Sequence, residues 1–60
     1  MMTTQELIKR MTGLKFEMMQ VAYDMTFSTD QSIHEHSTEL LGAAKILNDW
    51  IEHLINKEIA

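Results

Sequence analysis

Apolar residues recur at intervals of three or four through both halves of this 60-residue chain, and one polar segment separates the two series. The first series is Leu7, Met11, Leu14, Met18, Val21 and Met25. In the second, Ile33, Leu40, Leu47 and Leu54 recur every seven residues, with Ser37, Ala44 and Ile51 between them. This period is typical of helices that pack along an apolar seam. The pattern therefore predicts two helices.

The polar segment Ser28–Ser32 is predicted to be the turn between them, because its small polar side chains compete for backbone hydrogen bonds. A capping box at Thr3 and Glu6 favours a helix start near residue 4. Two alternatives exist for the second start, Ser28 with Gln31 and Ser32 with Glu35. We expect one all-α domain over residues 1–60, an antiparallel helical hairpin with helices over about 4–27 and about 30–57 and a turn over about 28–31.

A two-helix hairpin has a narrow core. A chain of this length buries only about 60% of the surface that it exposes when unfolded. Small folds compensate with disulfides, a metal or oligomerisation, and the absence of cysteine removes disulfides and thiolate zinc sites. A content of 45% hydrophobic residues argues against disorder. We therefore expect two copies to form a homodimeric four-helix bundle.

The first predicted helix carries a second apolar stripe that its seam does not use. Its members are spaced 3, 4 and 4 apart, largely behind the seam, and are Phe16, Met19, Tyr23 and Phe27. A second copy of the chain could cover this stripe. Alternatively, the stripe docks on a different protein, since aromatic and methionine side chains are favoured at such surfaces.

Small residues lie inside both predicted helices. Gly13 costs helix stability, and either the close approach of another backbone or a break in the first helix would explain it. In the second helix, Gly42, Ala43 and Ala44 form a narrow waist. We expect Gly13, Gly42, Ala43 and Ala44 to be sites of close helix packing.

The charge is uneven along the chain. Residues 1–27 carry three basic and three acidic side chains, whereas residues 28–60 carry two and six, a net charge of −4. The acidic second helix is expected to face solvent or to guide the chain toward a basic partner. The apolar runs are too short to span a membrane, and the first residues lack the pattern of a signal peptide. These features predict a cytoplasmic protein without membrane contact.

Histidines and acids cluster at the start of the second predicted helix without a complete metal site. His34 and His36 point about 200° apart on a helix, so they cannot share one ion. His36 with Glu39, and Asp49 with His53, each supply two ligands, so a metal site would need two chains. We expect surface histidines, no metal and no cofactor.

The segment His34-Glu35-His36-Ser37-Thr38-Glu39-Leu40 resembles the phosphoacceptor box of histidine kinases, His-Glu-x-x-Thr-x-Leu. It lacks the proline that precedes the leucine in that family, and it lies in the second helix rather than the first. The resemblance implies a phosphorelay-related protein, or one that mimics or blocks the kinase hairpin.

The expected architecture is similar to that of Rop-like regulators, small RNA-binding hairpins that dimerise into four-helix bundles. Ser32-Ile33-His34-Glu35-His36 and Glu39-Leu40 look similar to part of their second helix, although the offset from the turn differs. Binding of RNA would use a basic face of the first helix, for which the candidates are Lys9, Arg10, Lys15 and Phe16.

No catalytic residues are predicted, because the chain lacks a cysteine nucleophile, a glycine-rich phosphate loop and a nucleophile elbow. A small acidic hairpin of this kind is typical of modulators and inhibitors of other proteins, including those encoded by phages and prophages. We expect a non-enzymatic protein-binding module, with RNA binding and phosphorelay mimicry as alternatives.

Overall fold

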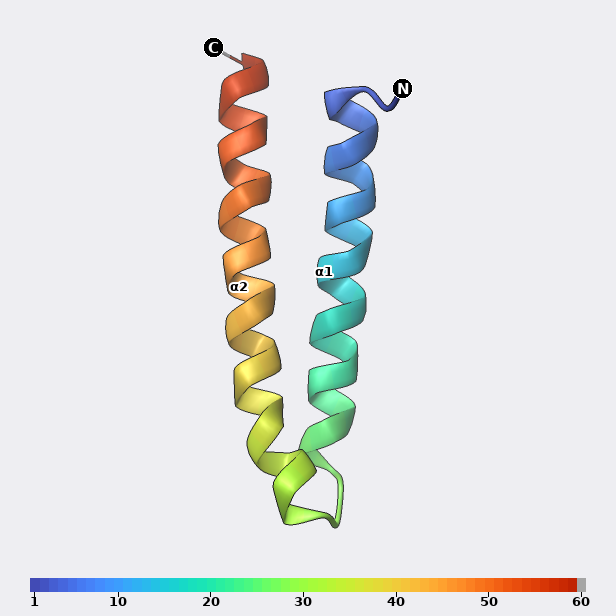
Figure 1. The fold of residues 1–60 in the computed structure, drawn as a ribbon, viewed down its shortest axis with the longest axis vertical. Helices are drawn as coiled ribbons and strands as arrows, with labels where there is room; N and C mark the ends of the chain where they lie inside the picture. The colour runs from blue at the N-terminus through green and yellow to red at the C-terminus, as the bar shows by residue number, and fades with distance from the viewer. Residues whose placement is uncertain (60) are drawn as a thin grey trace.

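The computed structural model describes residues 1–59 and contains, within that range, two helices and no strand. Helix α1 spans Thr4–Thr26 and helix α2 spans Gln31–Ile59. The helices lie side by side and run in opposite directions, so the two ends of the chain lie at the same end of the molecule (Figure 1). This confirms the predicted all-α hairpin, although the helix ends differ from the expected ranges by one or two residues. The molecule measures 45 × 18 × 14 Å.

The start of α1 follows the predicted capping pattern. The Thr3 hydroxyl oxygen accepts a hydrogen bond from the Glu6 amide at 3.1 Å, and the Thr3 carbonyl accepts one from Leu7 at 3.0 Å. At the other end, the amides of Phe27 and Ser28 donate to carbonyls three residues earlier, Asp24 and Met25. These short bonds tighten the last turn and end the helix.

Helix α2 begins at a cap that differs from both expected capping boxes. The Asp30 carbonyl accepts the first helical hydrogen bond, from His34, at 3.0 Å. The Asp30 carboxylate accepts hydrogen bonds from the Ser32 amide at 3.0 Å and the Ser32 hydroxyl at 2.8 Å. These bonds stabilise the charged form, so the pKa of Asp30 is lowered. Asp30 is therefore the N-cap. The Ser28 hydroxyl oxygen accepts a hydrogen bond from the Asp30 amide at 3.1 Å, which helps to hold the cap in place.

The seam between the helices is offset from the predicted one. On α1 the buried or half-buried residues are Ile8, Met11, Thr12, Lys15, Met18, Ala22, Met25 and Thr26. On α2 they are Ser37, Leu40, Ala44, Leu47, Asn48, Ile51 and Leu54. The prediction was wrong for Leu7, Leu14 and Val21 on α1 and for Ile33 on α2, which are exposed. The small side chains of Ala22, Ser37 and Ala44 are buried, whereas the larger side chains of Leu7, Leu14 and Val21 lie outside the seam.

The glycines are not packing sites within the hairpin. Helix α1 is continuous through Gly13, so it has no break there. A Cβ atom added at Gly13 or at Gly42 would have no atom within 4 Å. Of the four small residues expected in close packing, Ala44 is buried in the seam and Ala43 is exposed beside it. Close packing at either glycine stays a prediction about a second molecule.

We predict that Gly13→Ala and Gly42→Ala each stabilise the fold, by about 0.5–1 kcal/mol, because alanine favours helix and both positions have room for a methyl group. Chemical denaturation followed by circular dichroism measures this change in the free energy of unfolding. A destabilising effect of either substitution would show that another backbone packs against that glycine.

We predict that Asp30 makes stability depend on pH in the acid range. Its folded pKa is lowered from the ordinary 3.8, so its contribution is present above that value and is lost as the pH falls through the lower, folded value. Asp30→Asn keeps a capping oxygen but cannot ionise. The difference in unfolding free energy between the two proteins should therefore shrink on acidification. A difference that stays constant with pH would contradict this assignment.

Candidate interaction surfaces

The four residues of the predicted aromatic stripe are all exposed. The exposed fraction is 60% for Phe16, 44% for Met19, 64% for Tyr23 and 70% for Phe27. Exposed large apolar side chains are ordinary when scattered, but four at helical spacing form a continuous patch on α1. The hairpin itself therefore leaves the stripe uncovered. Cover by a second copy of the chain and docking on a different protein are both proposals.

The stripe is ordered by contacts among its own members and with a lysine. The rings of Tyr23 and Phe27 meet edge to face, with centroids 5.0 Å apart. The Lys15 ammonium lies 4.9 Å from the centre of the Phe16 ring, within the range of a cation–π interaction. The same ammonium donates a hydrogen bond to Asn48 Oδ1 on α2 at 3.0 Å. Lys15 thus links the aromatic stripe to the second helix.

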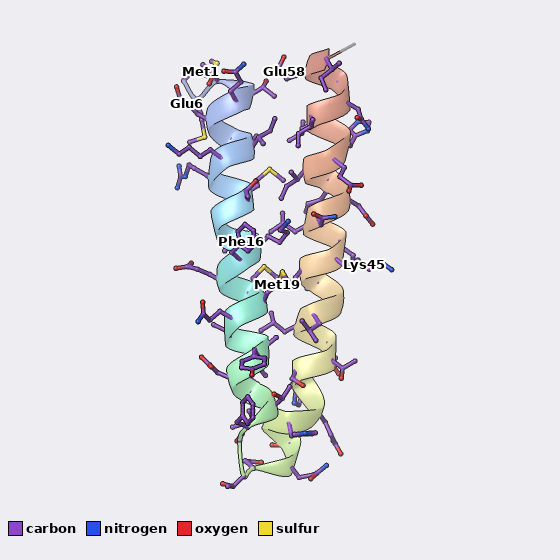
Figure 2. All side chains as sticks on the ribbon, turned by 180° about the vertical axis from the view of Figure 1, so that it is seen from behind. Met1, Glu6, Phe16, Met19, Lys45 and Glu58 are labelled. Carbon is purple, nitrogen blue, oxygen red and sulfur yellow. The ribbon has the colours of Figure 1, made fainter. Side chains whose placement is uncertain are left out.

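A groove between the helices borders the stripe. It has a volume of about 270 Å³ and is lined by Lys15, Met19, Leu41, Ala44, Lys45 and Asn48, and we call it the lysine groove. Figure 2 shows Phe16 on α1, Met19 between the two helices and Lys45 on α2. Two lysines therefore line this face, and the Lys45 side chain extends outward from α2 (Figure 2). The acidic side chains expected to guide a partner are on α2, whereas cations border the stripe itself.

A second groove has an entirely apolar lining. Its volume is about 380 Å³, and we call it the apolar groove, lined by Leu14, Met18, Ala43, Ile46, Leu47 and Trp50. Leu14 is 51% exposed and Trp50 is 60% exposed. Leu7 and Val21 lie one heptad before and after Leu14, so they extend the same face along α1.

The two grooves lie on opposite sides of the hairpin. On α1, Leu14 and Met19 are five positions apart, which is about 140° around the helix, with the seam between them. On α2, Leu41 and Ala43 are two positions apart, about 200° around the helix. The molecule is therefore a two-helix layer with a different apolar surface on each face.

The four residues proposed for RNA binding do not share one face. Lys9 lies one heptad before Phe16, on the side of the stripe. Arg10 is an i+3 and i−4 neighbour of Leu7 and Leu14, on the side of the apolar groove. Lys15 is half-buried and already bound to Asn48. The structure brings Lys15 against Phe16, with Lys9 on the same side of α1 as Phe16, and Arg10 lies about 120° around the helix from Phe16.

The histidine-rich segment forms the exposed first turns of α2. The His36 ring contacts the Ser32 carbonyl through Nδ1, and the Ser37 hydroxyl donates to the His34 carbonyl at 2.7 Å. Within residues 1–59, no three histidine, aspartate or glutamate side chains are grouped closely enough to hold a metal ion. Neither of the described helices is long and apolar enough to cross a membrane.

No protein-family model, curated protein or solved structure matches this chain. The apolar groove was missed from the sequence, although its signal was present. Ile46 and Trp50 are four residues apart on a helix, and Leu14 is one of the apolar residues assigned to the seam.

We predict different stability costs for the seam and the stripe. Ile51 is 4% exposed, so Ile51→Val should cost about 0.5–1.5 kcal/mol and Ile51→Ala about 2–5 kcal/mol. Tyr23→Ala removes an exposed ring and should cost less than about 1 kcal/mol. Urea denaturation of the three variants provides the comparison. Equal losses for Tyr23→Ala and Ile51→Ala would mean that the stripe belongs to the core.

Proposed function

We propose that this chain is a small, non-enzymatic protein-binding module that modulates or inhibits a cytoplasmic partner by occupying its surface. Two copies assemble into a four-helix bundle, and each presents its aromatic stripe outward. The observation that carries the proposal is the exposure of all four stripe residues on one continuous helix.

The chemistry of the stripe suits protein recognition. Aromatic and methionine side chains bury a large area for little loss of side-chain freedom and are enriched at protein interfaces. The edge-to-face contact of Tyr23 with Phe27 and the position of Lys15 over Phe16 hold three of the rings in defined positions. Because their geometry is already restricted, binding costs less conformational entropy.

The lysine groove indicates the partner's charge. Lys15 and Lys45 line it next to Met19, so an apolar surface edged with carboxylates would complement this face. The net charge of −4 for the whole chain keeps other surfaces acidic and disfavours nonspecific binding to phosphate backbones. A protein partner therefore fits this face better than a nucleic acid does.

We predict that Tyr23→Asp keeps the helical content of the wild type and abolishes capture of its partner. A carboxylate at this exposed position is solvated when the chain is free, but binding would bury it without a counter-charge. Affinity capture from the native cell, followed by mass spectrometry, identifies proteins retained by the wild type and lost in the variant.

Asn56→Asp is the matched control, because it adds the same charge at an exposed position near the end of α2, away from the stripe. It should retain the partner. Equal retention by Tyr23→Asp and the wild type would contradict docking through the stripe, and loss of helicity in Tyr23→Asp would assign the stripe to the core.

A further inference from the structure

The hairpin exposes more surface than a compact protein of its mass. The accessible surface of the chain is 4907 Å². A compact monomer of 7.0 kDa is expected to expose about 4,000 Å². The excess is about 900 Å², close to the roughly 800 Å² per partner that a standard stable interface buries. The area that this chain fails to bury alone thus matches what one further molecule would cover.

We propose that a second copy of the chain seats on the apolar groove, face to face and antiparallel, so that the turns of the two hairpins lie at opposite ends of the dimer. This inference rests on the four-helix assembly proposed above and adds the face and the orientation. The groove is the better candidate for the contact between copies because its lining carries no charged side chain, whereas two lysines and an asparagine line the lysine groove.

Four charged side chains flank the apolar groove, two near each end of the hairpin. At the open end of the hairpin, Arg10 neighbours Leu7 and Leu14, and Lys57 lies one heptad after Trp50. At the turn end, Asp24 follows Val21 by three residues and Glu39 precedes Ala43 by four. Of these four side chains, the two at the open end are basic and the two at the turn end are acidic. The other titratable groups along the rim are Glu6, which lies four residues before Arg10, and Glu17, Glu35, His36 and His53.

Two symmetric orientations can bring the two faces together. With the turns at the same end, α1 stacks on α2 of the second copy, so Arg10 approaches Lys57 and Asp24 approaches Glu39. With the turns at opposite ends, α1 stacks on α1 and α2 on α2, so Arg10 approaches Asp24 and Glu39 approaches Lys57. Like charges placed opposite one another disfavour an interface, and opposite charges favour it. These four side chains therefore favour the antiparallel orientation, in which both kinds of pair have opposite charges.

One two-fold axis satisfies both pairs. The midpoint between Arg10 and Asp24 is position 17, and the midpoint between Glu39 and Lys57 is position 48. The bond from Lys15 to Asn48 places positions 17 and 48 at nearly the same height, within about 3 Å along the hairpin. The same axis brings Ile46 against Trp50 and Leu14 near Val21 of the other copy. It also brings the Glu17 side chains of the two copies toward each other, one pair of like charges against four pairs of opposite charges.

Sedimentation equilibrium tests the face. The wild type is expected to be dimeric, and Ile46→Glu, which places a charge in the groove, should weaken the dimer at least about a hundredfold. Ile46→Ala is a milder second variant that keeps the helix and should also weaken it. Tyr23→Glu, on the opposite face, is the matched control and should dimerise like the wild type. An unchanged dimer in both Ile46 variants would overturn the inference.

Charge reversal tests the orientation. In the antiparallel dimer, the aspartate of Arg10→Asp lies opposite Asp24 of the other copy at two symmetric places. Each place then has two like charges, so the dissociation constant of the dimer should rise about tenfold. The double variant Arg10→Asp with Asp24→Arg restores both pairs and should recover the wild-type value. If the turns lie at the same end, Arg10→Asp instead faces Lys57 and tightens the dimer, which would overturn the proposed orientation.

The outcomes separate this inference from the proposed function. A wild type that stays monomeric at high micromolar concentration overturns both the assembly and the inference, but docking through Tyr23 can still be measured. If the dimer forms as described but Tyr23→Asp still captures the partner, the inference is supported and the docking proposal is overturned.

Discussion

The narrow seam between the two helices is the constraint on which the rest of this structure depends. Two helices can bury only one stripe of each against the other, and the buried apolar residues are Ala22, Ala44, Leu47 and Ile51. Two of these four are alanines, which contribute little apolar area. The close approach that they permit holds the helices together but leaves the larger side chains at the margins. Both exposed apolar surfaces follow from this geometry.

The two faces of the hairpin therefore differ in chemistry. One combines an aromatic stripe with two lysines, and the other is a groove lined only by apolar side chains. A dimer built on the apolar groove would leave the aromatic stripe accessible on both outer faces. The two copies would then present two equivalent docking surfaces, which increases the apparent affinity for a partner with more than one site.

Most of the fold could be predicted from the sequence, because helix spacing, one polar segment and a capping threonine are local signals. The seam was predicted less well. Leu7, Leu14 and Val21 fit the heptad spacing as well as Ile8, Lys15 and Ala22 do, and a lysine inside a seam is not an expected choice. Its burial depends on Asn48, which lies 33 residues away and accepts its hydrogen bond. Such a pairing has no signature in the spacing of either helix. The aromatic stripe was identified from its spacing alone, whereas the apolar groove is made by both helices and required the structure.

The emission of Trp50 tests the central claim most directly, because this is the single tryptophan of the chain and it lines the apolar groove. In one hairpin its side chain is 60% exposed. A dimer on this face would bury the indole, so its fluorescence should shift to longer wavelength on dilution, over the same concentrations at which the sedimenting mass falls by half. A dimer whose tryptophan emission remains that of a solvent-exposed indole at every concentration would contradict the account.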